Sequence, residues 1–354
     1  MFKIKNKKLK TLFITRKNPP QIGGMENYSY NLIQYFPGEK KVIKLTKPQY
    51  HLFWFIPYSI VQGLILGRRA DIIHIGDPVM SITGWIIKKV LKKPIVCTLY
   101  GLDLSYQNYL YQLYFKLFAK KFDLYVCISR ATEKIAHQKN IKNTMIIPVG
   151  VSPNLPVMPA EIPAPNGKKI LLTVGRLVKR KGVYWFIKNV FSYLKDCVYF
   201  IVGDGSEKVK IQNLIKIKKL ENSVFMLGRI NDEELEKIYQ KADLFIMPNI
   251  QVKNDLEGFG IVALEAGLRG LPVIASNIEG IKDAITQNQN GILVQEKNQQ
   301  VFIQTINKFL KDENLGQEFG KKAKEFVLKN FSWQKIARRY YQEFERILNK
   351  HTPL

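Results

Sequence analysis

The sequence contains little cysteine and histidine. Its three cysteines are Cys97, Cys127 and Cys197, and only four histidines occur among 354 residues. The cysteine count is odd, and each cysteine has apolar neighbours. We therefore expect buried, reduced thiols, as in a cytoplasmic protein. No group of histidine, cysteine or carboxylate residues has the spacing of metal ligands, so the sequence predicts no metal held by the protein.

Long apolar segments are also absent. No segment reaches the roughly 18 apolar residues that a membrane-spanning helix needs. The nearest candidate, residues 52–66, is interrupted by Pro57, Gln62 and Gly63. The apolar stretch 11–15 follows a basic start, but it is too short for a secretory signal. These absences predict a cytoplasmic protein.

Acidic residues are scarce relative to basic ones. The chain has 29 Asp and Glu against 55 Lys and Arg, a formal net charge of +26. Residues 1–150 carry 24 basic and 7 acidic residues, and residues 151–354 carry 31 and 22. The excess favours an anionic partner, although a solvated lysine-rich surface is the alternative. A nucleic-acid-binding protein would need a concentrated basic stripe. Because the cations are spread over both halves, we do not expect a nucleic-acid partner.

Short apolar runs alternate with longer amphipathic segments, which predicts βαβ units and parallel sheets in an α/β fold. Most runs are rich in Val, Ile and Leu without polar alternation, as expected when helices cover both faces of a sheet. In the first half the expected strands are 11–15, 41–45, 72–75, 95–99, 124–128 and 145–147. In the second half they are 170–174, 198–202, 224–227, 244–247, 272–275 and 291–294.

Five prolines within residues 153–165 exclude a helix or an inner strand there. We interpret this segment as a stiff linker between a domain of residues 1–152 and a domain of residues 166–330. Residues 331–354 are expected to form an amphipathic C-terminal helix that packs back toward the first domain. Doubly wound domains bind ligands at the carboxyl ends of their strands, so we expect a site in a cleft between the two domains.

The most informative segment is Glu257-Gly258-Phe259-Gly260-Ile261-Val262-Ala263-Leu264-Glu265. Its glycines break the preceding strand and let the backbone approach a ligand closely. A helix is expected to begin near Gly260 and to run through Gly267. The unpaired backbone N–H groups at its start suit phosphate or hydroxyl groups. Its two carboxylates are placed to contact opposite ends of a long ligand, and a nucleotide sugar has that shape.

Several motifs follow one another along the chain. The second half contains Gly-Arg-Leu-Val-Lys-Arg-Lys-Gly at 175–182, Gly-Asp-Gly at 203–205, the 257–265 segment and Gly-Leu-Pro-Val-Ile-Ala-Ser at 270–276. The first half contains Gly-Gly-Met-Glu at 23–26, Asp-Ile-Ile-His at 71–74, Gly-Leu-Asp at 101–103 and Pro-Val-Gly-Val at 148–151. In this order and spacing the chain resembles, over nearly its whole length, the retaining nucleotide-sugar glycosyltransferases of family 4 (glycosyltransferase group 1). The resemblance implies the GT-B fold, with an acceptor-side Rossmann-like domain and a nucleotide-sugar-binding Rossmann-like domain facing each other across a cleft.

The resemblance assigns roles to four residues of the second domain. Arg176 and Lys181 would neutralise the diphosphate and stabilise it as a leaving group, whereas the alternative is two solvated cations in a lysine-rich loop. Glu265 would accept hydrogen bonds from the ribose hydroxyls, and Glu257 from the transferred sugar. An ordinary exposed helix glutamate is the alternative for Glu265.

Glycine-rich turns complete the expected donor site. Gly23 and Gly24 resemble the family loop that lies over the diphosphate and the acceptor, although a plain turn is the alternative. The other expected donor-binding residues, of which 258–260 would act through backbone N–H groups, are Gly175, Gly203, Gly258, Phe259, Gly260 and Ile261. No cofactor and no protein-held metal are expected, and Mg²⁺ carried by the nucleotide is compatible with this prediction.

One motif departs from the family pattern. Many relatives have His-Gly-x-Asp where this chain has Tyr100-Gly101-Leu102-Asp103. A tyrosine phenol, with an unperturbed pKa of about 10, is a poor base at neutral pH. Because Tyr100 stands where relatives often have a histidine near the reacting sugar, the resemblance implies that it contacts the sugar or the acceptor. Asp103 is expected either to position the acceptor, as a fourth catalytic position beside Glu257, Arg176 and Lys181, or to cap the following helix. His74, near a strand end, is more typical of a satisfied core residue than of a catalyst.

Aromatic and leucine residues recur at helical spacing between Tyr106 and Phe118, beside Lys116, Lys120 and Lys121. Interfacial helices combine tyrosine and cations in this way, and residues 52–66 are a second candidate. We expect most of these side chains to pack on the sheet. Peripheral docking on an anionic membrane is the alternative.

These observations lead to one functional hypothesis. The chain is expected to be a retaining glycosyltransferase, a hexosyltransferase, which moves a sugar from a nucleotide-diphosphate sugar to a saccharide or lipid-linked acceptor. Its expected setting is cell-envelope polysaccharide or glycolipid synthesis, in the cytoplasm or at the inner face of the cell membrane. The alternatives are a nucleotide-sugar 2-epimerase of the same fold and a non-catalytic sugar-nucleotide-binding protein.

Overall fold

The computed structural model describes residues 8–21, 23–152, 167–253 and 255–351. The proline-rich segment that we interpret as a linker lies outside the described residues. The chain forms two compact units, one of residues 1–150 together with 333–354, and one of residues 151–332. We call them unit 1 and unit 2.

Unit 1 is built on a parallel sheet of six strands in the order β2-β1-β3-β4-β5-β6. The strands are β1 (Lys10–Thr15), β2 (Glu39–Lys44), β3 (Ile72–Ile75), β4 (Ile95–Leu99), β5 (Leu124–Cys127) and β6 (Thr144–Ile146). The order reverses between β1 and β3, which makes the sheet doubly wound and places its switch point there.

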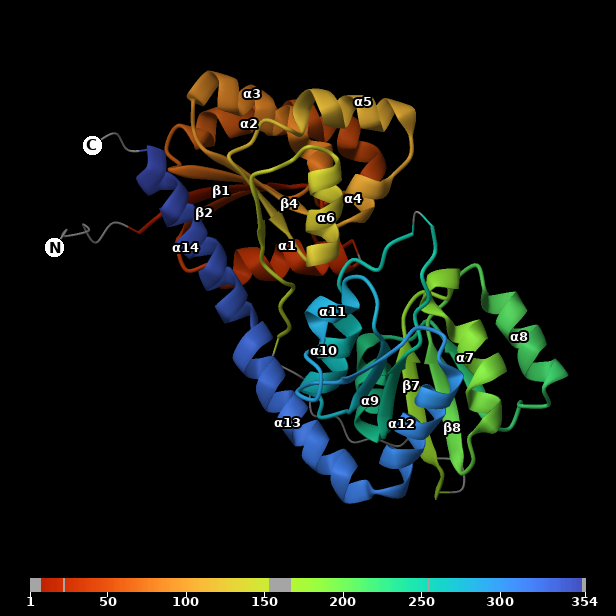
Figure 1. Ribbon diagram of the computed structural model, residues 1–354. Helices are drawn as coiled ribbons and strands as arrows, with labels where there is room; N and C mark the ends of the chain where they lie inside the picture. The colour runs from red at the N-terminus through yellow and green to blue at the C-terminus, as the bar shows by residue number, and fades with distance from the viewer. Residues whose placement is uncertain (1–7, 22, 153–166, 254, 352–354) are drawn as a thin grey trace. The chain divides into compact units, whose positions relative to one another are not determined.

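Helices cover both faces of this sheet (Figure 1). They are α1 (Gly24–Tyr35), α2 (Leu52–Gly67), α3 (Ser81–Leu91), α4 (Leu102–Ser105), α5 (Tyr109–Phe118), α6 (Arg130–Gln138) and α14 (Trp333–His351). In Figure 1, α2, α3 and α5 lie on one side of the sheet, and α1 lies on the other with α14 beside it. The inner strands β3, β4 and β5 are buried along their whole length as a result, which explains their largely apolar sequences, whereas the edge strand β2 is mostly exposed.

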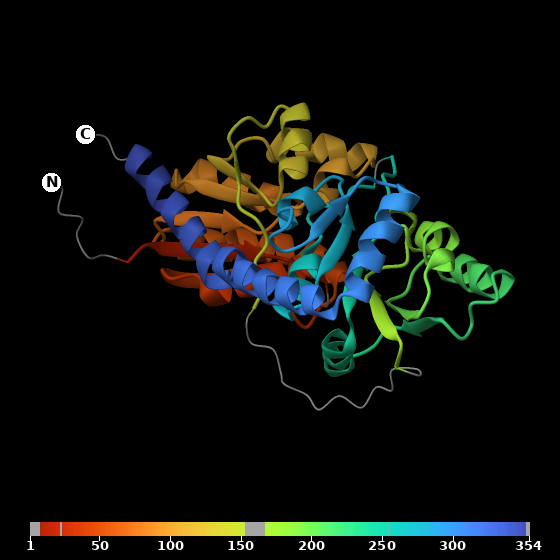
Figure 2. The same ribbon diagram turned by 60° about the horizontal axis from the view of Figure 1, so that its bottom comes forward.

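A buried chain of hydrogen bonds ties α14 into unit 1. Tyr340 of α14 contacts the phenol of Tyr28 in α1 at 2.7 Å and the hydroxyl of Thr98 in β4 at 2.9 Å. Thr98 in turn contacts His74 Nε2 at 2.9 Å. The C-terminal helix therefore belongs to the core of unit 1, and Figure 2 shows it against the same elements from a second direction. It begins at Trp333 because Ser332 is extended and separates it from α13 (Glu313–Phe331).

Unit 2 has a second parallel sheet in the order β12-β11-β10-β7-β8-β9. Its strands are β7 (Lys169–Val174), β8 (Cys197–Val202), β9 (Val224–Gly228), β10 (Leu244–Met247), β11 (Val273–Ser276) and β12 (Ile292–Val294). Its helices, besides α13, are α7 (Val183–Asn189), α8 (Lys208–Ile217), α9 (Asp232–Lys241), α10 (Ile261–Leu268), α11 (Ile281–Ala284) and α12 (Gln299–Lys311). The order reverses between β7 and β10. The predicted α/β fold of two doubly wound Rossmann-like domains is thus confirmed.

The predicted packing of the Tyr106–Phe118 segment is wrong for most of its residues. On α5 and just before it, five of the large side chains are exposed, namely Tyr106, Tyr109, Leu110, Leu113 and Leu117. Phe115 is the buried residue of α5, and Tyr111 and Tyr114 on its face are partly buried. Because two faces of this helix are apolar, helical periodicity does not reveal which face meets the sheet. None of the described helices is long and apolar enough to cross a membrane.

Candidate functional site

The predicted residues of unit 2 gather at the carboxyl edge of its sheet. Gly175 and Arg176 directly follow β7, Gly203 follows β8, and α10 begins directly after Gly260. Asn249 follows β10, the strand next to β7 across the reversal in strand order. Ligands of doubly wound sheets bind at this edge and at this switch point. The site therefore lies where the fold itself favours a ligand.

Two glycine turns pack closely at this edge. Gly203 has a φ of 132°, and a Cβ on it would collide with the carbonyl oxygen of Gly175. The N–H of Gly203 donates to the carbonyl of Gly228 at 2.7 Å, and the N–H of Gly175 donates to Val202 at 2.9 Å. The predicted glycines thus bring the ends of β7 and β8 together, and only a residue without a side chain fits at 203.

Glu257 is the centre of a buried ionic cluster. Its Oε2 atom lies 2.7 Å from Lys181 Nζ and also accepts from Arg180 Nη1. Asn249 Nδ2 donates to the same oxygen at 2.8 Å. Burial would raise the pKa of Glu257, but the charges of Lys181 and Arg180 outweigh it and lower the pKa below its ordinary value. Glu257 is therefore a carboxylate at neutral pH.

The cluster leaves one oxygen of Glu257 available. Every contact of this carboxylate with the described residues falls on Oε2. The side chain of Glu257 is about 10% exposed to solvent. Oε1 can thus accept hydrogen bonds from a ligand while Oε2 keeps the carboxylate oriented.

Sequence reasoning missed Arg180, which it treated as one of three consecutive cations. Its side chain is 6% exposed and pairs with Asp255 at 3.0 Å as well as with Glu257. The sequence did contain a clue: Asp255 and Glu257 lie two residues apart, and if they are buried they need a buried cation beside them. Glu279 was missed too: its carboxylate accepts the backbone N–H of Glu257 at 2.6 Å, and burial raises its pKa.

Glu265 lies on α10 and is partly exposed. Its carboxylate accepts from the hydroxyl of Tyr239 at 3.4 Å and has no ion pair among the described residues. The neighbouring Arg269 pairs instead with Glu236, to which its Nε donates at 2.7 Å. Burial raises the pKa of Glu265. This carboxylate is oriented by Tyr239, but no cation in the described part of the chain pairs with it, so it can accept hydrogen bonds from hydroxyl groups of a ligand.

The start of α10 offers free donors. Gly260 has a φ of 83° and precedes the first turn, and the side chain of Phe259 is buried against Phe331. Within the described part of the chain, the backbone N–H groups of residues 258–261 donate no hydrogen bond. Arg176 is exposed and forms no ion pair with the described residues. These N–H groups and this guanidinium form a cationic edge suited to phosphate oxygens.

The predicted residues of unit 1 lie at the carboxyl edge of its own sheet. Gly24 begins α1 after β1, and a Cβ on Gly23 would collide with the carboxylate of Glu26. Glu26 is buried and pairs with Lys17 at 2.7 Å. Gly23 thus makes room for an ion pair within its own turn, and its predicted contact with a donor stays a prediction.

Asp103 is tied into the turn that follows β4. Its carboxylate accepts the backbone N–H groups of Tyr100, Gly101 and Leu104 at 2.7–3.1 Å. Asp103 is the second residue of α4, whose N-cap is Gly101, so the alternative that it caps a following helix is wrong, and its carboxylate instead closes the turn between β4 and α4. Burial raises the pKa of Asp103 to about 7 against the effect of these hydrogen bonds.

Tyr100 and His74 are both buried. The ring of Tyr100 meets Tyr28 edge-on at 5.2 Å, and burial raises the pKa of its phenol well above the ordinary value. His74 packs between Phe13 and Tyr340, and burial lowers its pKa to about 3. At neutral pH the phenol of Tyr100 keeps its proton, and the imidazole of His74 is neutral but too weak a base to take one up. The expectation that His74 is a core residue agrees with this packing.

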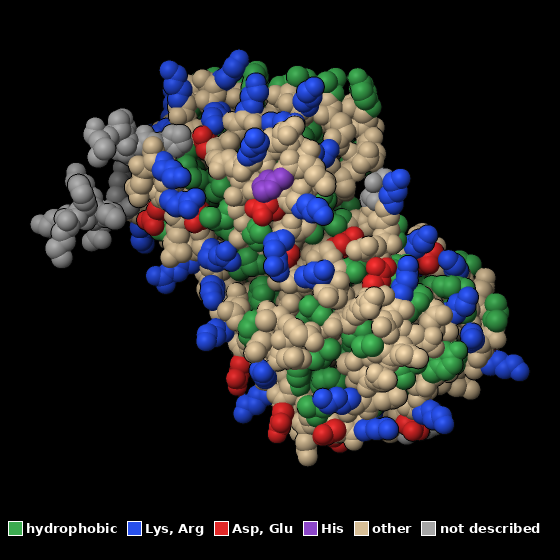
Figure 3. Space-filling view, in the orientation of Figure 1, with side chains coloured by type: hydrophobic (Ala, Val, Ile, Leu, Met, Phe, Trp, Pro, Cys, Tyr) green, Lys and Arg blue, Asp and Glu red, His purple; other side chains and the backbone are tan. Residues whose placement is uncertain are grey.

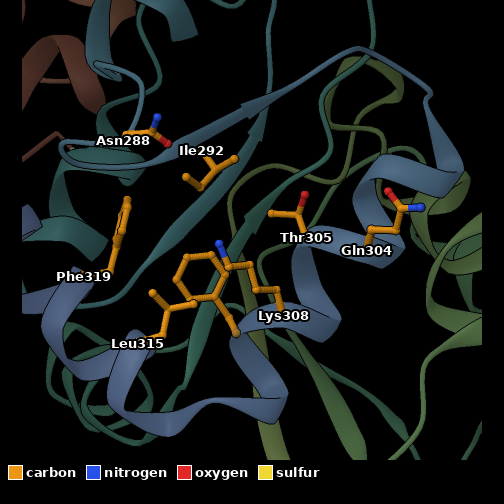
Figure 4. A pocket seen from close by; sticks show the side chains of 8 residues that line it. Asn288, Ile292, Gln304, Thr305, Lys308, Leu315 and Phe319 are labelled. Carbon is orange, nitrogen blue, oxygen red and sulfur yellow. The ribbon is translucent and has the colours of Figure 1, made fainter.

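A cavity of about 470 Å³ in unit 2 contains none of the predicted residues (Figure 4). It lies between the sheet edge at Ile292, α12 and the start of α13, and its other lining residues are Asn288, Gln304, Thr305, Lys308, Phe309, Leu315 and Phe319. The cavity is mostly apolar and has one charged residue, so it does not match the phosphate-binding character of the carboxyl edge.

Two family models match the chain in succession. The model described as Glycosyltransferase Family 4 matches residues 37–155, and the one described as Glycosyl transferases group 1 matches residues 156–326. An uncharacterized glycosyltransferase of Methanocaldococcus jannaschii is 28% identical over 81% of this chain and 79% of its own length. Another from the same organism is 31% identical, but over 49% of this chain and 44% of its own length. The N-acetyl-alpha-D-glucosaminyl L-malate synthase of Bacillus anthracis is 23% identical over 84% of this chain and 81% of its own length.

Solved structures share the fold. HepE of Anabaena in complex with UDP superposes with a TM-score of 0.75 at 18% identity, covering 96% of this chain and 100% of that one. The sucrose-phosphate synthase of Thermosynechococcus elongatus gives a TM-score of 0.75 at 21% identity, covering 97% and 100%. At these identities the likeness establishes the architecture of the chain.

Proposed function

Because the chain belongs to the group 1 / family 4 glycosyltransferases, which have the GT-B fold, we propose that it transfers a sugar from a nucleotide-diphosphate sugar to a saccharide or lipid-linked acceptor with retention of configuration. One observation carries the proposal. The oriented carboxylate of Glu257, the unneutralised carboxylate of Glu265 and the free N–H groups of residues 258–261 share one sheet edge.

The proposed donor position follows from these groups. The diphosphate would lie against the N–H groups of residues 258–261 and the guanidinium of Arg176. Glu265 would accept from the ribose hydroxyls. Glu257 would accept from the transferred sugar through Oε1, since its Oε2 is occupied by Lys181, Arg180 and Asn249. The phosphate charge would thus be balanced by this chain's own cations and amides, without a protein-held metal.

The proposed reaction needs no protein base. The bond between the anomeric carbon and the donor phosphate breaks, the acceptor oxygen bonds to that carbon on the same face, and its proton moves to the departing phosphate oxygen. The buried states of Tyr100 and His74 support this route, because neither takes up a proton at neutral pH. The cationic edge stabilises the charge that develops on the leaving diphosphate.

Two measurements test the proposal. A thermal-shift panel of UDP, GDP and ADP sugars should identify a donor, since a donor at about 100 times its Kd adds about 2.7 kcal/mol of stability. Transfer by Glu257→Ala should then fall by at least about 100-fold, the loss expected for a group that acts on the transferred sugar in the transition state. Transfer by Glu265→Ala at low donor concentration should fall by about tenfold or more, because its contacts to the donor are lost. The proposal fails if both variants transfer sugar as the unmodified protein does.

The same panel separates the two other candidate activities. A 2-epimerase would convert the donor without any acceptor. A non-catalytic binding protein would be stabilised by the donor but would neither hydrolyse nor transfer it. Release of the nucleotide that depends on an added acceptor supports only the transferase.

We further propose peripheral contact with an anionic membrane, in line with a role in envelope polysaccharide or glycolipid synthesis. Phe53 and Trp54 of α2 and Tyr109 and Leu110 of α5 are each at least 72% exposed. Figure 3 shows Lys and Arg scattered over the visible face of each unit rather than gathered in one stripe. Exposed aromatic side chains on a unit with scattered cations fit anionic lipid better than they fit nucleic acid, which needs a concentrated basic stripe.

Vesicle sedimentation tests this contact. Phosphatidylcholine vesicles with phosphatidylglycerol should bind the protein, and Phe53→Ser/Trp54→Ser should weaken binding by at least about tenfold. The matched control is Tyr193→Ser, which changes an exposed aromatic residue of unit 2. Equal binding by all three proteins would contradict the contact.

A further inference from the structure

A second cavity lies in unit 1 at the amino edge of the sheet, opposite to the edge that carries the predicted residues. Its volume is about 440 Å³. It is formed by the starts of β1 and β2 and by the end of α2. The lining residues are Lys10, Thr11, Glu39, Lys40, Lys41, Leu66, Arg69 and Ala70. Four cations and one carboxylate therefore surround this space.

Two of the four cations are already engaged. Lys10 lies 3.7 Å from Glu39. Lys40 Nζ donates to the carbonyls of Ile33 and Gln34 at the end of α1, at 2.6 and 2.9 Å.

The other two cations lack a counter-charge. Lys41 and Arg69 form no ion pair with any described residue. The nearby carboxylate of Asp71 accepts the backbone N–H of Lys10 and forms no ion pair with either of these cations. The cations that line the cavity outnumber its one lining carboxylate, and such a concave cationic space attracts anions.

Thr11 supplies an independent observation. Its side chain is 2% exposed, and its Oγ1 atom has no hydrogen-bond partner among the described residues, although it lines the cavity. A buried hydroxyl without a partner costs about 1–3 kcal/mol, so a ligand that accepts or donates a hydrogen bond here would remove a penalty. An apolar residue at position 11 would have avoided this cost in a site meant only for packing.

We propose that this cavity binds a phosphate group, with Lys41 and Arg69 as the charge partners and Thr11 as a hydroxyl donor. A guanidinium contacts two oxygens of a phosphate at once, an ammonium acts as a point charge, and a threonine hydroxyl donates to a third oxygen. The phosphate belongs either to a soluble ester or to a lipid headgroup, and the two sources present the same chemistry to the cavity. This site is independent of the proposed donor site, which lies in unit 2.

Calorimetric titration with inorganic phosphate at low ionic strength tests the site. Lys41→Gln/Arg69→Gln should weaken binding by at least about tenfold, since two charge-assisted contacts are lost. The matched control is Lys44→Gln/Arg68→Gln, which removes the same charge from the same strand and the same helix end, at residues that do not line the cavity. Thr11→Val should also weaken binding, by about threefold or more, without loss of stability.

Two further arms separate the phosphate sources and the donor site. Titration of Arg176→Gln shows whether phosphate instead occupies unit 2. Sedimentation with phosphatidylglycerol vesicles compares the cavity variant with its control. If the cavity variant binds inorganic phosphate more weakly than its control but binds vesicles equally well, the ligand is a soluble phosphate ester. If the cavity variant also binds vesicles more weakly, the ligand is a lipid headgroup. The inference is overturned if the cavity variant and its control bind phosphate and vesicles equally, or if Arg176→Gln alone abolishes phosphate binding.

Discussion

The ammonium group of Lys181 lies 2.7 Å from the carboxylate of Glu257, in a position that is largely buried. With Arg180 on the same oxygen, the carboxylate is fully compensated. Lys181 is thus ion-paired in this structure, whereas Arg176 is exposed and forms no ion pair with the described residues, and the diphosphate contact of both residues stays a prediction. Lys181 and Arg176, to which the family resemblance gives the same role, therefore have different electrostatic environments in this chain.

Replacing Glu257 should destabilise the protein as well as impair transfer. In Glu257→Gln, Arg180 and Lys181 lose a buried counter-charge, which should lower the free energy of unfolding by about 3 kcal/mol. Urea denaturation measures this loss. The exposed Glu221→Gln provides a charge-matched control and should change stability by less than about 0.5 kcal/mol. Identical unfolding midpoints for the two variants would refute the buried ion pair.

Glu265 should behave in the opposite way. Its carboxylate has no ion pair among the described residues, and burial raises its pKa, so Glu265→Gln should leave stability unchanged or slightly higher. Donor binding should nevertheless weaken by about tenfold or more, because hydrogen bonds to a charged acceptor contribute about 1.5–3 kcal/mol. Calorimetry with the donor found by the panel gives the comparison. A variant that unfolds early yet binds the donor normally would argue against the ribose role.

Asp103 should make stability depend on pH between about 4 and 7. Its pKa is about 7 in the folded protein and about 4 in an unfolded chain, so the folded state holds the extra proton between these values. The contribution of this group to stability is present below about pH 4 and is lost as the pH rises to about 7. Urea titrations across this range should show a smaller decline for Asp103→Asn, which keeps an acceptor but does not titrate. Parallel curves for both proteins would contradict the raised pKa.

Tyr340→Phe should weaken the packing of α14 against the rest of unit 1 and so lower the stability of the protein. The change removes the partner of the Tyr28 hydroxyl and one partner of Thr98, both of which are buried. A loss of about 1–3 kcal/mol is expected, since an orphaned buried hydroxyl carries its full desolvation penalty. The control is Tyr193→Phe, at a phenol that is 60% exposed. Thermal unfolding should separate the two, and equal melting temperatures would speak against the buried network.

Gly203→Ala should be far more damaging than Gly228→Ala. Both residues have positive φ, at 132° and 70°. A Cβ on Gly228 meets no atom within 4 Å, whereas one on Gly203 collides with the backbone of Gly175. Gly228→Ala should cost about 1–2 kcal/mol from backbone conformation alone, and Gly203→Ala should cost more. Equal losses of stability for the two variants in urea denaturation would show that the turn at Gly203 does not pack closely against the backbone of Gly175.

Much of the architecture could be predicted from the sequence. Apolar runs without polar alternation marked strands that are covered on both faces, and both sheets have the doubly wound order expected of them. Placement at the carboxyl edge then followed from topology, because Arg176, Gly203 and Gly260 each come directly after a strand or before a helix.

What could not be predicted depended on side-chain direction. Lys179, Arg180 and Lys181 are chemically alike in sequence, but the turn that ends at Gly182, with a φ of 68°, points Arg180 into the protein. The apolar faces of α5 were indistinguishable for the same reason: periodicity defines stripes and does not identify their partners. The link between Tyr28 and Tyr340 joins residues 312 positions apart, and no local pattern specifies such a contact.

The division of unit 1 into two segments has a consequence for biosynthesis. The helix that covers the α1 face of its sheet follows unit 2 in the chain, so it leaves the ribosome after unit 2 has emerged. Until then Tyr28, Phe36 and His74 lack the buried partners that α14 supplies. Unit 1 is therefore an incomplete domain for most of translation, and it presents an apolar surface to chaperones, proteases and neighbouring chains.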